Sequence, residues 1–184
     1  MASDVAAEIL AIYTARGPEA YFGEQVSMTE HALQTAHFAE QAGAPQALVL
    51  AALLHDIGHL LEPLPADIGD WTSDAHHEAL GARWLAERLP AEISEPVRLH
   101  VAAKRYLCAT DVGYLAKLSA ASGHTLKLQG GPMPASEMRQ FERERYFREA
   151  VCVRRWDDEG KVAGLRTAPL EAYARLITQL ARPR

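Results

Sequence analysis

The chain has 184 residues, 48% of them hydrophobic and 23% charged, which is the composition of a globular protein and excludes a disordered chain. Its length predicts a single domain over residues 1–184. Only two cysteines are present, so a disulfide scaffold is excluded, and the longest apolar run, residues 47–54, is too short to cross a membrane. A net charge of −5 disfavours a nucleic-acid partner. The N-terminus resembles no secretory signal, so we expect a cytoplasmic protein without a membrane partner.

The first half of the chain reads as helices that end at glycine or begin at proline. Ser3 is the expected N-cap of a helix that runs to about residue 15. Thr29 is the expected N-cap of a second helix, which closes at Gly43. Pro45 then precedes residues 46–55, which are apolar on almost every side and predict the central buried helix.

The second half predicts five more helices, and the whole pattern favours an all-α bundle. A loop is expected at Pro63 and Pro65, a second one over residues 129–134, and a turn over residues 158–160. Residues 150–156 carry a weak strand signal, which is the exception to the helical pattern. The expected helices run from Ser73 or Asp74 through Arg88, from Ser94 to about Cys108, from Asp111 to Ser119, from Ser136 to about Glu149, and from Pro169 to near Ala181.

A His-Asp pair, His55 and Asp56, closes the most apolar helix. Burying two polar groups there costs several kcal/mol unless they are paired or bind a metal. Neighbouring side chains on a helix diverge by about 100°, so the pair suits two adjacent metals, with the aspartate bridging them. The alternative is a simple helix C-terminus, where the macrodipole favours histidine and Asp-Ile-Gly forms a turn.

Three further histidines recur once per predicted helix, and an aspartate lies in the turn before the last helix. Side chains spaced in this way can point at one interior position of a bundle. Imidazole and carboxylate ligands suit iron, zinc, manganese or nickel. Six donors exceed the needs of one catalytic metal and therefore indicate two ions. The six candidates are His31, His55, Asp56, His77, His100 and Asp157.

The other histidines have less specific positions. His76 fits the spacing as well as His77 does. His37 lies six residues after His31 and is expected to be a surface or packing residue, and His124 is expected in an exposed loop. His59 is either a helix cap or a residue that supports the substrate site.

These residues resemble the HD-domain superfamily of metal-dependent enzymes. The closer resemblance is to mixed-valent di-iron oxygenases of organophosphonate catabolism, the 2-amino-1-hydroxyethylphosphonate dioxygenase family. It rests on residues 21–24 (YFGE), 53–59 (LLHDIGH), 100–107 (HVAAKRYL) and 129–133 (QGGPM), and it covers residues 20 to 160 approximately. The expected fold is therefore an HD-domain helical bundle.

The resemblance also implies roles for individual residues. The six candidates above would hold two iron ions (Fe²⁺/Fe³⁺), with dioxygen as co-substrate. Tyr21 corresponds to a residue that occupies an iron in the resting site and leaves when substrate binds, and Glu24 to its partner in that movement. Without the resemblance, Tyr21 would be an aromatic residue packed on the core, and Lys104 would be a solvated helical lysine. Its i, i+4 spacing from His100 nevertheless places Lys104 on the same helix face as that candidate ligand. The positions that hold the phosphonate oxygens correspond to His59, Lys104, Ser122 and Gln129.

The implied substrate is a 1-hydroxy-2-(amino or trimethylammonio)ethylphosphonate, cleaved to phosphate and glycine or glycine betaine, with hydroxymethylphosphonate as another family substrate. Trp71 lies among aspartates and either holds a quaternary ammonium or packs as a lid. Two other functions stay open. The same metal cage could serve a phosphohydrolase of a small phosphate ester, or a non-enzymatic helical module with a structural metal.

Overall fold

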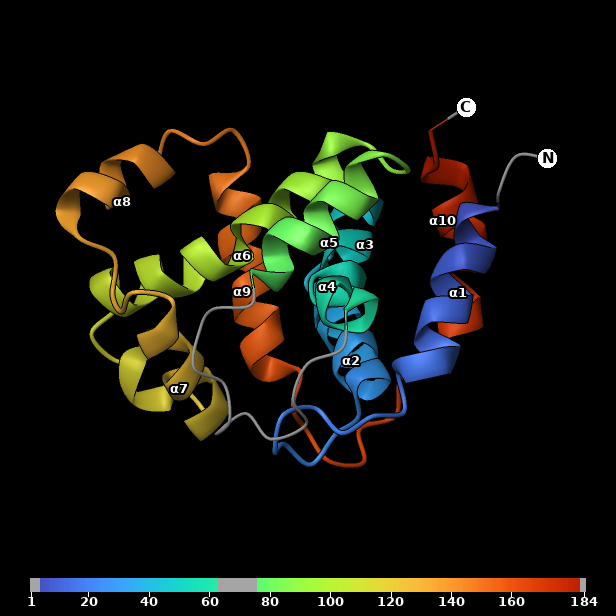
Figure 1. The fold of residues 1–184 in the computed structure, drawn as a ribbon, viewed down its shortest axis with the longest axis horizontal. Helices are drawn as coiled ribbons and strands as arrows, with labels where there is room; N and C mark the ends of the chain where they lie inside the picture. The colour runs from blue at the N-terminus through green and yellow to red at the C-terminus, as the bar shows by residue number, and fades with distance from the viewer. Residues whose placement is uncertain (1–3, 63–75, 183–184) are drawn as a thin grey trace.

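The computed structural model describes residues 4–62 and 76–182 of the chain. These residues form one all-α domain, as predicted, and the first and last helices lie side by side (Figure 1). No helix in the described part is both long and apolar enough to cross a membrane.

Four helices form the N-terminal half: α1 (Val5–Arg16), α2 (Met28–Gln41), α3 (Gln46–Leu54) and α4 (Ile57–Leu61). Asp4 is the N-cap of α1, and the predicted cap, Ser3, lies outside the described residues. The predicted cap of α2 is wrong by two positions, because Ser27 forms a capping box with Glu30. Gly43 follows the end of α2 at φ 69°, as its predicted C-terminal role requires.

The central helix is α3, and seven of its nine residues are buried, as its apolar sequence predicts. The chain bends at Asp56 and continues as the short helix α4, which the sequence analysis missed. Gly58 allows α4 to approach α5 (His77–Ala86) closely, because a Cβ atom there would lie 1.9 Å from the carbonyl oxygen of His77.

The start of α5 that was predicted at Ser73 or Asp74, and the loop at Pro63 and Pro65, lie outside the described residues. The next helix, α6 (Ala91–Thr110), begins after Pro90 and not at Ser94, which is buried inside its first turns. Proline is favoured at such a position because its missing N–H costs nothing before the first turn.

The C-terminal half differs most from the sequence prediction. The helix expected over residues 111–119 is only a 3₁₀ turn over Leu115–Lys117, and α7 (Ala120–Leu128) follows it where a loop was expected. The helix expected from Ser136 to Glu149 is broken into two shorter ones, and the last helix begins as a 3₁₀ turn. The elements are α8 (Ala135–Phe141), α9 (Phe147–Glu159), η3 (Leu170–Tyr173) and α10 (Ala174–Leu180).

Helix α9 also overturns two further predictions. The weak strand over residues 150–156 is helical, and the turn expected at 158–160 is reduced to Gly160 at the helix C-terminus. Asp157 therefore lies in the last turn of a helix and not in a loop. The loop over residues 129–134 is confirmed, with Gly130 and Gly131 at positive φ.

Two apolar clusters hold the helices together. The main cluster takes side chains from α1 through α6 and from α9 and α10. The smaller cluster joins α6, α8 and α9, with Leu99, Phe141 and Ala150 at its centre. Helices α6 and α9 contribute to both clusters and so connect them.

Candidate metal centre and adjoining pocket

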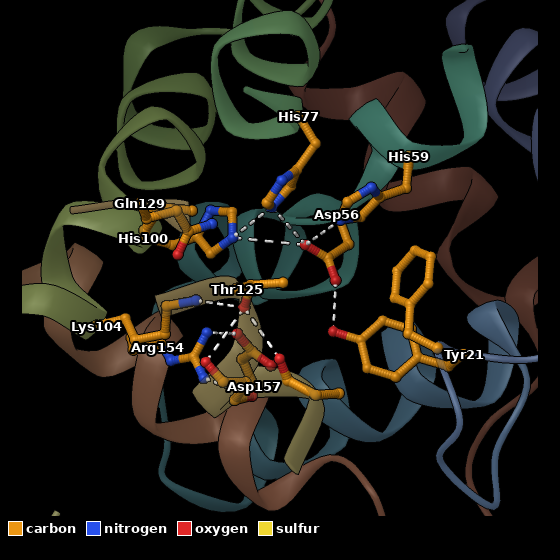
Figure 2. Close-up of a pocket in the computed structure, with 14 residues that line it drawn as sticks. Tyr21, Asp56, His59, His77, His100, Lys104, Thr125, Gln129, Arg154 and Asp157 are labelled. Carbon is orange, nitrogen blue, oxygen red and sulfur yellow. Dashed lines mark hydrogen bonds and ion pairs between the residues drawn. The ribbon is translucent and has the colours of Figure 1, made fainter. Parts of the chain in front are cut away.

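The six predicted metal ligands come together from four helices and the α3–α4 bend. Each is at most 7% exposed, and Figure 2 shows four of them around one pocket. His31 comes from α2, His77 from α5 and His100 from α6. His55 and Asp56 lie at the end of α3, and Asp157 comes from the last turn of α9.

One group of donors consists of His31, His55 and Asp157. The Nε2 atoms of His31 and His55 lie 3.1 Å apart. An oxygen of Asp157 lies 3.4 Å from the first of these nitrogens and the other oxygen 3.8 Å from the second. Their ligand atoms are close enough together to hold one ion.

A second group consists of His77, His100 and Asp56. The Nε2 atoms of the two histidines are 3.2 Å apart, and Asp56 Oδ1 lies 3.2 and 3.4 Å from them. The other oxygen of Asp56, Oδ2, lies 3.3 Å from His55 Nε2 and 3.6 Å from His31 Nε2. Asp56 thus has one oxygen toward each group, which is the bridging position that its place beside His55 predicted.

The backbone sets the orientation of three of the imidazoles. Nδ1 of His31, His55 and His100 lies 2.8, 2.8 and 2.7 Å from the carbonyl oxygens of Gly160, Ala52 and Val97 respectively. A carbonyl oxygen only accepts hydrogen bonds, so each Nδ1 carries a hydrogen, and each ring turns its Nε2 atom, the one left to bind a metal, to the interior. The separations of about 3 Å between donor atoms are those of neighbouring ligands bonded to a metal at about 2.0–2.1 Å. The residues present therefore fit two metal ions.

The electrostatics favour a positive charge at this point. Burial opposes ionisation of Asp56, but His55 and hydrogen bonds from neighbouring histidines outweigh it and hold its pKa well below the usual range. Asp157 is buried too, and Arg154 keeps its pKa well below the usual range. Burial lowers the pKa of His55, yet the two carboxylates raise it to about 9. The carboxylates thus attract either a proton or a metal ion to the same place.

Tyr21 covers the centre from the turn before α2. Its hydroxyl donates a hydrogen bond of 2.8 Å to Asp56 Oδ2, and its ring stacks on His31 with centroids 3.9 Å apart. Burial and the charge of Asp56 raise the pKa of Tyr21 well above its ordinary value, so the phenol keeps its proton. Glu24 lies on the same turn, where its backbone N–H donates to the Tyr21 carbonyl. The Glu24 side chain does not line the pocket, and its buried Oε1 accepts no hydrogen bond from the described residues.

The four predicted substrate residues, His59, Lys104, Ser122 and Gln129, all line a pocket next to the metal ligands. Lys104 is 2% exposed, and its Nζ donates to Thr125 Oγ1 at 2.9 Å. Burial, and next the charge of Arg154, lower the pKa of Lys104 to about 7. Gln129 has a buried Oε1 that accepts no hydrogen bond from the described residues. His59 stacks on His77 at 3.8 Å, on the opposite side of Asp56 from Lys104 (Figure 2).

The sequence analysis missed three residues of this pocket region: Thr125, Arg154 and Lys161. Arg154 is buried and pairs with Asp157 at 2.6 Å and with Asp158. Its i, i+3 and i, i+4 spacing to these aspartates is a helical signal, which was hidden because residues 150–156 were read as a strand. Thr125 was missed because α7 was taken for a loop.

The remaining histidines differ from the six ligands in exposure and position. The side chain of His76 is 72% exposed, so His77 alone of this pair faces the centre. His37 is half-buried and contacts Gln41 at the surface, as expected. His124 lies half-buried on α7 and not in an exposed loop. Trp71 lies outside the described residues.

Comparisons with known proteins confirm the resemblance that the motifs indicated. The HD-domain family model matches residues 28–177. The chain is 45% identical over 169 residues to [1-hydroxy-2-(trimethylamino)ethyl]phosphonate dioxygenase (glycine-betaine-forming) of Leisingera caerulea, covering 92% of this chain and 86% of that protein. It is 42% identical over 156 residues to hydroxymethylphosphonate dioxygenase of Gimesia maris, covering 84% and 78% respectively. The chain belongs to the HD-domain family, in the group that contains these phosphonate dioxygenases.

Proposed function

We propose that this protein is a di-iron dioxygenase that cleaves the C–P bond of a 1-hydroxy-2-(amino or trimethylammonio)ethylphosphonate. Dioxygen is the co-substrate, and the products are phosphate and glycine or glycine betaine. The observation that carries the proposal is the position of six buried metal donors beside a pocket that contains two buried basic side chains, Lys104 and Arg154. The 45% identity to a dioxygenase named for the trimethylamino substrate supports it.

The proposed metal ligands divide as the geometry divides them. His31, His55 and Asp157 would hold one iron, while His77 and His100 would hold the other, with Asp56 between the two. His59 also lies close enough to Asp56 and His77 to be a ligand, but the family resemblance assigns it to the phosphonate. When bound, the iron pair supplies the redox chemistry that activates dioxygen and oxidises C1 of the substrate. The backbone carbonyls that accept from His31, His55 and His100 would keep these imidazoles oriented toward the metal site while the iron changes oxidation state.

The proposed phosphonate site lies on the α6–α7 side of the pocket. Lys104 places its amino group there. Burial lowers the pKa of this group, and a bound dianionic phosphonate would raise it again and so favour the ammonium form. The Gln129 amide and the Ser122 hydroxyl supply neutral hydrogen-bonding groups beside it. Charge-assisted hydrogen bonds in a water-poor pocket are stronger than those on a surface, so an acidic protein can still bind an anion.

Tyr21 is the proposed gate. With Tyr21 bound to Asp56, the pocket holds about 40 Å³, which is room for a few water molecules at about 10–15 Å³ each. A phosphonate with a trimethylammonio group is larger than a few water molecules, so we expect the turn that carries Tyr21 to move when the substrate binds. Phe22 and Gly23 form a tight turn at positive φ, closed by a hydrogen bond from Glu24 N–H to the Tyr21 carbonyl, so Glu24 would move with Tyr21.

The second candidate is a phosphohydrolase that uses the same donors with water as nucleophile. Both named relatives are dioxygenases, which favours oxidation. The deciding experiment is anaerobic purification with iron, followed by measurement of phosphate release with and without oxygen. We expect release only with oxygen and with one O₂ consumed per phosphate. Release under strictly anaerobic conditions would instead support the hydrolase.

The substrate is tested by competition between phosphonates. We expect a higher kcat/KM for a substrate with an amino or trimethylammonio group than for hydroxymethylphosphonate, and the reverse order would overturn this choice. We also propose that one domain spans residues 1–184, because the main apolar cluster joins α1 to α10. A cytoplasmic location fits the two unpaired cysteines, Cys108 and Cys152.

A further inference from the structure

We propose that Lys161 is a positioning residue that turns the Ser122 hydroxyl into a hydrogen-bond donor toward the substrate phosphonate. The proposal deepens the function above, because it concerns the anion-binding side of the same pocket. Neither the motifs nor the spacing of the sequence pointed to Lys161, which lies just after the end of α9.

The contacts of Lys161 place its charge inside the protein. Its side chain is 11% exposed, and its Nζ donates to Ser122 Oγ at 3.1 Å. The same ammonium lies 3.9 Å from Asp157 Oδ1, close enough to be held by that carboxylate. Arg154, seven residues earlier and on α9, approaches Ser122 Oγ from its Nη2 atom at 3.5 Å. Two cationic donors therefore converge on one hydroxyl oxygen.

The direction of the remaining hydrogen bond follows from the chemistry of a hydroxyl group. Serine has two acceptor lone pairs and one O–H donor. Lys161 and Arg154 occupy the acceptor side, so the O–H is left to donate. Within the described residues no protein oxygen accepts from it, and Ser122 lines the pocket. A hydroxyl that accepts from a cation is also a stronger donor, because hydrogen bonds in a chain polarise one another.

Lys161 itself does not line the pocket. Its direct hydrogen bond toward the pocket is the one to Ser122 Oγ, although its ammonium also lies 5.8 Å from the centroid of the Tyr21 ring and 3.9 Å from Asp157 Oδ1. This separates Lys161 from Lys104, which does line the pocket and can reach the phosphonate directly. A double-mutant cycle between Lys161 and Ser122 measures the difference.

The experiment measures binding of methylphosphonate to the iron-loaded enzyme by calorimetry without oxygen. Methylphosphonate carries the anionic group but lacks the C1 hydroxyl. Four proteins complete the cycle: wild type, Lys161→Met, Ser122→Ala and the double variant. Lys161→Arg, which keeps a cationic donor, is the conservative rescue. Lys127→Met, which removes an exposed lysine from α7, is the control for loss of charge alone.

We expect Lys161→Met and Ser122→Ala each to raise Kd about tenfold, as for loss of a hydrogen bond to a charged group. The double variant should bind within about twofold of Ser122→Ala, because Lys161 has nothing left to position. Lys161→Arg should bind better than Lys161→Met, and Lys127→Met should bind like wild type.

A fully additive double variant would overturn the proposal, since it would mean that Lys161 acts on the anion without Ser122. An unchanged Kd in Lys161→Met would also overturn it. Iron content and the melting temperature identify a variant that has lost its fold, and Lys161→Gln then takes its place in the same cycle. The binding cycle needs no turnover, so a wild type that fails to release phosphate with oxygen would defeat the proposed function without deciding this test.

Discussion

The two sides of the pocket are built differently. The metal side consists of histidines and aspartates on helices that pack into the main apolar cluster, and three of its imidazoles are fixed by backbone carbonyls. The phosphonate side comes from α6, from α7 and from the loop after α7, next to the smaller cluster. Here Gln129 Oε1 is buried and accepts no hydrogen bond from the described residues. The metal side therefore has its geometry set by the fold, whereas the phosphonate side retains hydrogen-bonding capacity for a ligand.

The largest expected effect comes from breaking the bridge on the metal side. Asp56→Asn removes the charge that faces both groups of histidines, so we expect loss of one or both irons and a fall in activity on the order of a thousandfold or more. Metal analysis and kcat measure it. Asp111→Asn, which alters an exposed ion pair with Arg155, is the control and should keep both. Full iron occupancy in Asp56→Asn would refute the bridging assignment.

The next effect compares one glycine on each side. Gly58→Ala places a methyl group 1.9 Å from the His77 carbonyl oxygen, so we expect a loss of about 1–3 kcal/mol in unfolding free energy together with weaker iron binding, because α5 must shift. Gly123→Ala lies in open space on α7 and should stabilise the protein by up to about 1 kcal/mol. Urea unfolding measures both changes. Equal changes in unfolding free energy for Gly58→Ala and Gly123→Ala would contradict the prediction that α4 and α5 are packed more closely at Gly58 than α7 is at Gly123.

A smaller effect is expected from the phosphonate side. Lys104→Met should raise KM for the phosphonate by about tenfold to a hundredfold while iron content stays unchanged, because it removes a buried charge-assisted hydrogen bond. The pKa of Lys104 is lowered to about 7. Its ammonium form, and the affinity it provides, should therefore be present below that pH and decline as pH rises through it. Bound phosphonate shifts this decline upward, and Lys104→Met should lack it altogether. If wild type and Lys104→Met lose affinity for the phosphonate equally as pH rises, so that KM increases in the same way in both, the loss belongs to another group.

The smallest effect on stability is expected at Tyr21, where the two sides meet. Tyr21→Phe removes the hydrogen bond to Asp56 and should cost about 1 kcal/mol. If the phenol protects the centre from oxygen in the absence of substrate, the variant should consume at least about twice as much O₂ per phosphate released as wild type, since little else about the site changes. Oxygen-electrode and phosphate assays give this ratio. A ratio equal to that of wild type would show that the Tyr21 hydroxyl is not the gate.

The helical class and the metal donors were accessible from sequence because both depend on spacing. The apolar stretch over residues 46–55 predicted a buried helix, and burying the polar pair at its end is costly unless the pair is satisfied there. The recurrence of His31, His77 and His100 at about one per helix then placed them near the pair, and the structure brings all of them together. The spacing did not distinguish His76 from His77, which only the direction of the α5 N-terminus decides.

The failures cluster in the C-terminal half, where local signals compete with packing. Residues 150–156 have branched and aromatic residues that suit a strand, but burying Val153 in the main cluster and Arg154 beside Asp157 favours a helix. Ser119 caps α7 in a segment whose glycine and serine suggested a loop. These errors hid Arg154 and Thr125, because a residue assigned to the wrong element is expected on the wrong face.

By itself, the sequence predicted the all-α class and the six donors that a family motif and helical spacing both indicated. The tertiary structure decided which oxygen of Asp56 faces which histidines, and which carbonyls orient the imidazoles. It also decided that Lys161 and Arg154 meet at Ser122. The physical reason is that periodicity along a chain records which face of a helix is buried. The partner of a buried polar group comes from another helix, and only packing chooses it.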